Sequence, residues 1–172
     1  MNVWFHDASR PLLVDIDLVR PYENNANSGD EDAVVDSIMT SGFYGAVIAQ
    51  QGTGTLVAGH TRYAALHQLG ATQIPVIWVQ VDDVAAARMR LADNRTTRLG
   101  RDDPALLLEE LDALKEHELA LLGTGYDDDY LDALRLSLEQ PLSFNDEEFA
   151  KQRSGHVCEC RRCGWRSDDK GD

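Results

Sequence analysis

The chain has 172 residues, 43% of them hydrophobic, and a formal net charge of −14 at pH 7. This length and composition suffice for one main hydrophobic core with a small appendage. The excess of acid excludes a protein that coats nucleic acid over its whole surface, because phosphate contacts depend on clustered lysine and arginine. Basic residues outnumber acidic ones within 61–101, so we expect an anionic ligand there; a solvated helix face paired with nearby acids is the alternative.

The start of the chain and its cysteines favour a cytoplasmic protein. The first residues carry no basic segment followed by a long apolar run, and no stretch approaches the roughly 18 apolar residues of a membrane span. All three cysteines fall in HVCECRRC, so the rest of the chain cannot form the disulfide framework of a secreted domain. We therefore expect a reducing, cytoplasmic environment and no membrane partner.

The first elements along the chain mix strand and helix signals. LLVDIDLV (residues 12–19) alternates well enough to predict a strand, and a turn-rich loop follows it. A helix is predicted from Asp30 as its N-cap to Gly42 as its C-terminal stop. The segments AVIAQ and TLVA, separated by QGTG, predict a hairpin.

Helices dominate the remainder of the predicted elements. HTRYAALHQLG predicts a helix that ends at Gly70, and PVIWVQV predicts a strand buried on both faces. Apolar periodicity and composition indicate three further helices, VAAARMRLADNRTTR, PALLLEELDALKE and DDDYLDALRLSLEQ. Together these elements predict an α+β main domain at 1–101, an acidic helical extension at 102–140 and a polar tail at 141–172.

The stretch TLVAGHTRYAALHQLG combines a glycine turn with an arginine at the start of a helix. A strand that turns at Gly59 directly into a helix leaves the first N–H groups of that helix unpaired, and these form an anion site. Arg62 can add a bidentate donor to a phosphate held there. The motif alone is a weak signal, because Gly59 could be only a turn glycine and Arg62 a surface residue paired with an acid.

The order of the segments around this motif resembles the ParB N-terminal, or ParB/sulfiredoxin, superfamily domain. Three blocks carry the resemblance in sequence order: SGFYGAVI at a helix-to-strand junction, GHTRYAA where partition proteins carry Gly-Glu-Arg-Arg, and ADNRTT where they carry Glu-Asn. The resemblance covers residues 12–100. It implies a ParB/sulfiredoxin-like small mixed sheet with packed helices, which binds a nucleoside triphosphate, CTP or ATP, together with Mg²⁺.

The resemblance also implies roles for individual residues. The phosphates would be held by Gly59, His60, Thr61 and Arg62, and the base or ribose side would be lined by Gly42 and Gly45. Asp93 and Asn94 would hold Mg²⁺, which prefers a carboxylate or two with phosphate oxygens and waters. Asp93 would also be the catalytic residue, and Asn94 and Arg95 would complete the nucleotide-binding set.

The chain departs from the family at two positions that bear on its activity. The sulfiredoxin branch needs a cysteine in the Gly-x-x-Arg block, and this block has none, so repair of sulfinic acids is not expected. The loop PYENNANSG lacks the arginine that commonly follows its asparagine in the family. The choice of nucleotide is therefore left open.

The tail contains a candidate zinc knuckle. His156, Cys158, Cys160 and Cys163 lie within eight residues of one another, and Cys-x-x-Cys-Gly is the turn that places two thiolates on one ion. A closed site normally takes its other pair of ligands from a second turn. Three interpretations stay open: a zinc site, a site completed by a second chain, and a redox-sensitive tail without metal.

The acidic composition of residues 103–139 separates this chain from full-length partition proteins, because such helices cannot read DNA. Short stand-alone relatives occur on phages and mobile elements as ParB-like nucleases. We therefore expect a nucleotide-binding protein of DNA metabolism that acts as a nucleotide hydrolase or weak nuclease, with DNA as a candidate partner. The alternative is a non-enzymatic, nucleotide-responsive adaptor whose acidic helices bind a protein; a homodimer is compatible with either.

Overall fold

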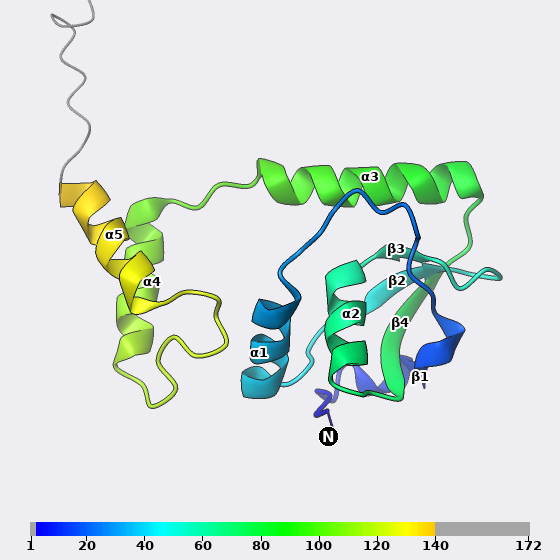
Figure 1. Cartoon of the computed structure of the whole chain (residues 1–172), viewed down its shortest axis with the longest axis horizontal. Helices are drawn as coiled ribbons and strands as arrows, with labels where there is room; N and C mark the ends of the chain where they lie inside the picture. The colour runs from blue at the N-terminus through cyan, green and yellow to red at the C-terminus, as the bar shows by residue number, and fades with distance from the viewer. Residues whose placement is uncertain (1–2, 140–172) are drawn as a thin grey trace, which may run out of the picture. The chain divides into compact units, whose positions relative to one another are not determined.

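Five α-helices and four strands make up the part of the chain that the computed structural model describes, residues 3–139 (Figure 1). The strands are β1 (Leu13–Asp15), β2 (Val47–Gln50), β3 (Leu56–Ala58) and β4 (Gln73–Val79). The helices are α1 (Glu31–Ser41), α2 (His60–Gln68), α3 (Asp83–Leu99), α4 (Pro104–Lys115) and α5 (Asp128–Glu139). Short 3-10 turns, Arg10–Leu12 and Ile16–Leu18, flank β1.

The strands form one mixed sheet in the order β1-β4-β2-β3. β2 and β3 form the predicted antiparallel hairpin, whereas β4 runs parallel to β2 and antiparallel to β1. The parallel pair is reached through α2, since a parallel connection needs a crossover. The α+β prediction is therefore confirmed.

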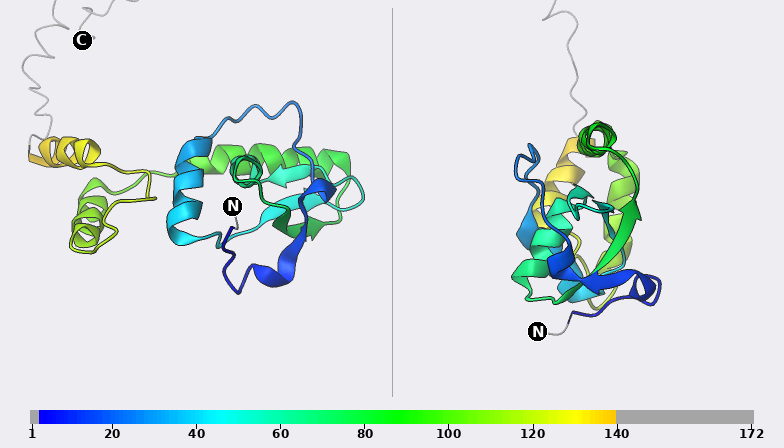
Figure 2. Two further views of the ribbon diagram at one scale, coloured as in Figure 1. Left: turned by 60° about the horizontal axis from the view of Figure 1, so that its bottom comes forward. Right: turned by 90° about the vertical axis from the view of Figure 1, so that its right-hand side faces the viewer.

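The two ends of α1 are set by local features of the sequence. The Asp30 side chain accepts a hydrogen bond from the Ala33 N–H at 3.0 Å, which satisfies a free donor of the first turn. Gly42 ends the helix with a φ of 73°, a conformation that glycine adopts without strain. Both predicted ends are confirmed. α1 packs against α2 beside the sheet (Figures 1 and 2).

The core lies between the sheet and these two helices. Its fully buried side chains come from both layers: Val47, Ala49, Leu56, Ala65, Leu66 and Ile74. Burial of these side chains is the main term that stabilises the fold. α3 lies along one side of the sheet domain, beside β3 and the loop that precedes α1 (Figures 1 and 2).

Two strand predictions are wrong in part. Only Leu13–Asp15 of the predicted strand 12–19 is extended, because the Asp15 carboxylate accepts from the Asp17 N–H and turns the chain into a 3-10 turn. β4 is buried on both faces only near Ile74–Val76; Ile77 and Trp78 are 46% and 37% exposed. β1 pairs with β4 no further than Pro75, so among the described strands none lies beside the rest of that edge.

The helical extension has a small core of its own. Leu111, Leu121 and Leu131 are buried together, between α4, α5 and the loop that joins them. Asp127 accepts from the Tyr130 N–H at 2.7 Å, as expected if the acids before α5 cap that helix. The division of the chain at 101 and 140 stays a prediction. Within residues 3–139 no helix is long and apolar enough to span a membrane.

Candidate functional site

A cavity of about 540 Å³ lies where the first turn of α2 meets α1, α3 and the loop that precedes α1. The residues that line it come from segments far apart in the sequence. They are Asn25, Asn27, Ala33, Val34, Ser37, Ile38, Phe43, Tyr44, Gly45, Gly59, His60, Thr61, Arg62, Asp93, Asn94, Thr97, Gly123, Thr124 and Gly125. Cavities of this size hold small-molecule ligands.

The first turn of α2 contributes backbone donors to the cavity. Gly59 precedes the helix with a φ of 90°, and a Cβ there would lie 2.9 Å from Cγ1 of the buried Val47. Side chains of Asp30, Asp82 and Asp103 cap α1, α3 and α4, but no side chain within residues 3–139 caps α2. The N–H groups at the start of α2 are therefore available to an anion.

Arg62 provides the fixed positive charge of the cavity. It is the third residue of α2, as predicted, and its Nη1 donates to the Ala46 carbonyl at 2.8 Å. No acid pairs with it within residues 3–139. The hydrogen bond at Nη1 leaves Nε and Nη2 free, which is the edge that binds a phosphate through two parallel hydrogen bonds.

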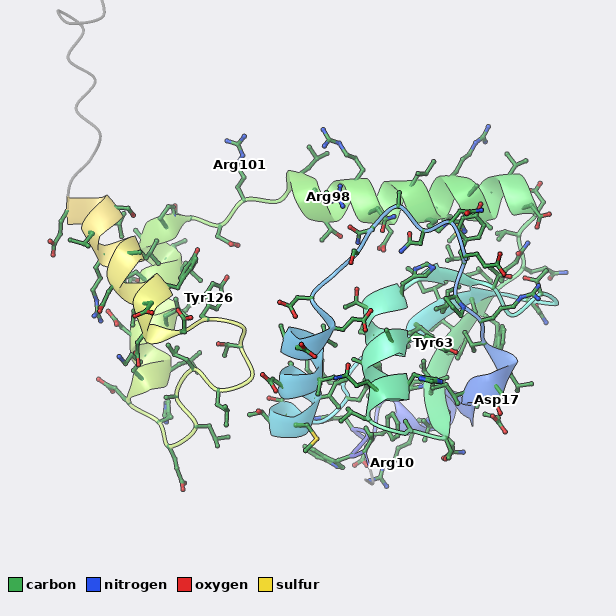
Figure 3. All side chains as sticks on the ribbon, viewed as in Figure 1. Arg10, Asp17, Tyr63, Arg98, Arg101 and Tyr126 are labelled. Atoms are coloured by element: carbon green, nitrogen blue, oxygen red, sulfur yellow. The ribbon has the colours of Figure 1, made fainter. Side chains whose placement is uncertain are left out.

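A chain of amide hydrogen bonds fixes the orientation of Asn94. The Asn25 Nδ2 donates to the Asn27 carbonyl at 2.8 Å, so its Oδ1 is the acceptor for the Asn94 Nδ2 at 3.2 Å. This leaves the Asn94 Oδ1 as a free acceptor at the cavity wall. Arg98 also holds the loop, since its Nη2 donates to the Asn27 Oδ1 at 2.5 Å (Figure 3 labels Arg98).

His60 is held as a neutral imidazole. Its Nε2 accepts the Tyr22 N–H at 3.4 Å, so the proton lies on Nδ1. Burial lowers the pKa of His60 below its usual 6.5, the nearby Arg90 lowers it further, and Asp93 opposes them. Arg90 is buried and lies 3.5 Å from the centroid of the Tyr22 ring. A neutral Nδ1–H is a hydrogen-bond donor and not a base.

Another part of the cavity lining is largely apolar. α1 and the junction after it contribute Ala33, Val34, Ile38, Phe43 and Tyr44. The two kinds of wall suit an amphiphilic ligand with one anionic part and one flat or apolar part.

The structure brings together most of the residues that the sequence singles out. Gly45, Gly59, His60, Thr61, Arg62, Asp93 and Asn94 all line the cavity. Gly42 and Arg95 do not line it: Gly42 packs against the Trp4 ring, and Arg95 is exposed on α3. The roles given to all these residues stay predictions.

Sequence reasoning missed several residues of the cavity. The Asn25–Asn27 pair had a signal in the asparagine-rich loop PYENNANSG, and Tyr44 had one in the block SGFYGAVI. Ser37 carries no such signal, because it reads only as a polar residue of an amphipathic helix. Gly123, Thr124 and Gly125 come from the helical extension, which the sequence placed outside the site.

The donor set of the cavity fits Mg²⁺ bound together with phosphate. Asp93 is the acid that lines it among the described residues, and its carboxylate makes no hydrogen bond or ion pair there. With the free Oδ1 of Asn94 it offers two hard oxygen ligands, and Mg²⁺ completes its shell with phosphate oxygens and waters. No cluster of three metal-binding side chains occurs within residues 3–139. The zinc prediction at His156, Cys158, Cys160 and Cys163 lies outside the described residues.

Comparison with protein families gives a match for the segment that contributes most of the cavity lining. Residues 14–95 match the family model of the ParB N-terminal domain. The resemblance predicted from the sequence is therefore confirmed. A comparison with proteins of curated function gives no significant match.

The fold is shared with one solved structure at low sequence identity, and two further structures match with lower TM-scores. The C-terminally truncated chromosome-partitioning protein ParB from Caulobacter crescentus, complexed with CTP-gamma-S, has a TM-score of 0.58 and 15% identity; the match covers 83% of this chain and 84% of that one. The same protein complexed to the centromeric parS site has a TM-score of 0.41, 15% identity and coverages of 83% and 78%. A Pnob8-like ParB-N domain has a TM-score of 0.38, 10% identity and coverages of 87% and 53%.

Proposed function

We propose that this chain, whose residues 14–95 belong to the ParB N-terminal domain family, binds a nucleoside triphosphate in the cavity between α1, α2 and α3. The observation that carries the proposal is the uncapped first turn of α2 with Arg62 beside it. Backbone donors and a guanidinium that pairs with no acid in the described part of the chain are the groups that bind phosphate. The matched Caulobacter crescentus structure of the same fold, which contains CTP-gamma-S, supports this assignment.

In this proposal the phosphates contact Gly59, His60, Thr61 and Arg62. Asp93 and Asn94 hold Mg²⁺, which when bound neutralises charge on the phosphates. The neutral His60 donates from Nδ1 to a phosphate oxygen. Gly45 allows the guanidinium to approach, because a Cβ there would lie 2.9 Å from Nη1 of Arg62. Gly42 and Arg95 act indirectly, through the Gly42 turn and the charge of α3.

Calorimetry with a panel of nucleoside triphosphates, with and without Mg²⁺, tests the proposal. Arg62→Ala should weaken binding by roughly one to two decades, since a hydrogen bond to a charged group contributes about 1.5–3 kcal/mol. Arg101→Ala is the matched control: Arg101 lies beyond the end of α3, points away from the sheet domain and does not line the cavity (Figure 3). Equal affinity of wild type and Arg62→Ala would refute the phosphate site.

Hydrolysis is a second proposal, favoured by the free Asp93 carboxylate beside the phosphate wall. The described lining contains no cysteine, and His60 is a donor there, so catalysis depends on metal-bound phosphate and not on a covalent intermediate. Released phosphate should depend on Mg²⁺ and disappear in Asp93→Ala. Binding without release of phosphate would favour the adaptor, whose acidic helices α4 and α5 bind a protein partner.

The wider setting of the proposal is DNA metabolism, with DNA as a candidate partner and a homodimer as a candidate state. Mobility-shift assays with and without nucleotide test the first, and sedimentation at several protein concentrations tests the second. Zinc in the tail is proposed separately. Metal analysis of reduced protein should find about one zinc per chain or per pair of chains, and a chelator should release it.

A further inference from the structure

Tyr44 is an exposed aromatic residue among those that line the cavity. It lines the cavity and leaves 69% of its surface exposed, whereas the preceding Phe43 is 2% exposed. The two residues lie between the C-terminal stop of α1 and β2, and Phe43 forms an isolated β-bridge with Phe5, as in a strand, where successive side chains point to opposite sides. Burial of Phe43 in the core therefore directs the Tyr44 ring outward.

The backbone beside Tyr44 is held by the N-terminal segment. The Phe43 N–H donates to the Trp4 carbonyl at 2.8 Å, and the His6 N–H donates to the Phe43 carbonyl at 3.0 Å. The His6 ring also bonds through Nε2 to the Ser41 carbonyl at 2.8 Å. The position of the residue is therefore fixed before any ligand binds, which lowers the entropy lost on binding.

The ring itself is partly oriented by aromatic packing. The centroids of the Tyr44 and His6 rings lie 6.3 Å apart at 85°, an edge-to-face contact, and the centroid of the Trp4 ring lies 4.2 Å from that of His6. This contact uses only part of the ring. The large exposed fraction of Tyr44 leaves its remaining surface for a ligand.

We infer that Tyr44 is the residue on which the base of the bound nucleotide stacks. The inference rests on the proposed function, because it needs the phosphates at the first turn of α2. Planar bases stack on tyrosine without regard to their hydrogen-bonding pattern. The Ser37 hydroxyl lines the same cavity and has no hydrogen-bond partner within residues 3–139, so it can pair with the base or ribose.

Calorimetry with two ligands separates the base from the phosphates. A nucleoside triphosphate and inorganic tripolyphosphate are each titrated, with Mg²⁺, into wild type, Tyr44→Ala and Tyr44→Phe. Tyr44→Ala should lose about 5- to 150-fold in affinity for the nucleotide and none for tripolyphosphate, since stacking contributes about that factor per base. Tyr44→Phe should restore the lost affinity. Tyr130→Ala, which removes an exposed tyrosine of α5 away from the lining, is the control.

Each other result overturns the inference in a recognisable way. Equal losses for both ligands in Tyr44→Ala would make Tyr44 a structural residue of the aromatic surface with Trp4 and His6. Unchanged nucleotide affinity in Tyr44→Ala would show that Tyr44 does not contact the nucleotide. If wild type binds both ligands equally, the phosphate site would be supported, but no contact with the base would contribute to affinity. Wild type that binds neither ligand would refute the proposed function, and the inference with it.

Discussion

The Arg62 guanidinium donates from Nη1 to the Ala46 carbonyl at 2.8 Å, and it does so across the position where a side chain at residue 45 would begin. The hydrogen bond fixes Nη1 and leaves the Nε–Nη2 edge of Arg62 for the proposed phosphate. It is possible because residue 45 is a glycine.

Gly45→Ala should therefore weaken nucleotide binding while the stability of the fold is retained. An added Cβ lies 2.9 Å from Nη1, so the guanidinium must shift, and the end of a long side chain shifts at little cost to the core. Calorimetry and a thermal melt measure the two effects. Gly100→Ala is the matched control, because its Cβ meets only ordinary contacts. Undiminished binding in Gly45→Ala would contradict this role.

Gly59→Ala should destabilise the fold. The residue combines a φ of 90° with a close approach to buried Val47, and a non-glycine residue in that conformation costs about 1–3 kcal/mol before any clash. Gly52→Ala isolates the backbone term, because Gly52 has a φ of 91° and open space around its Cβ position. In urea unfolding, Gly59→Ala should be less stable than Gly52→Ala. The reverse order would show that the Val47 side chain can move away from the added Cβ without loss of stability.

Asn25→Ala should reduce the part of nucleotide affinity that depends on Mg²⁺. The substitution removes the acceptor that orients Asn94, so the Asn94 Oδ1 is no longer held in place for the proposed Mg²⁺. The measurement compares titrations in Mg²⁺ and in chelator. Asn24→Ala changes the exposed neighbour and should leave the ratio of the two affinities unaltered. If the ratio of affinity in Mg²⁺ to affinity in chelator were as high in Asn25→Ala as in wild type, Asn94 would not be a ligand of the metal.

His60 should make the fold less stable in acid. Its folded-state pKa is lowered from 6.5 by burial and by Arg90, so below pH 6.5 the unfolded chain binds the proton more readily than the folded one. Stability from this group is complete above pH 6.5 and is lost as the pH falls toward the lower, folded-state pKa. Thermal melts from pH 7.5 to pH 5 should show a smaller loss in His60→Gln than in wild type. His67→Gln, on the same helix, is the control, and its stability should fall with pH as that of wild type does.

Local signals in the sequence predicted those helix ends that are set by a capping side chain or by a glycine. Asp30 and Gly42 bound α1 as expected, and Gly59 starts α2 so that Arg62 is its third residue. These features depend on a few neighbouring residues, and their chemistry can be read from the sequence. The resemblance to a family then supplied a small mixed sheet with packed helices, and the strand order came only from the structure.

The cavity was predicted less completely, because its members meet only in the folded chain. Asn25 and Asn94 are 69 positions apart, and nothing in either segment indicates that their amides pair. The exposure of Ile77 and Trp78 likewise depends on how far β1 extends along β4. Burial at that strand is decided by a neighbour and not by its own apolar residues.

The two groups of buried apolar side chains have no residue in common, and the one formed by Leu111, Leu121 and Leu131 is much the smaller. Amide protons of α4 and α5 should therefore exchange with solvent through a subglobal opening. Those of β2, whose Val47 and Ala49 are completely buried, should exchange only when the whole domain unfolds. A rise in temperature would then release Gly123, Thr124 and Gly125 from the cavity before the wall made by α2 is lost.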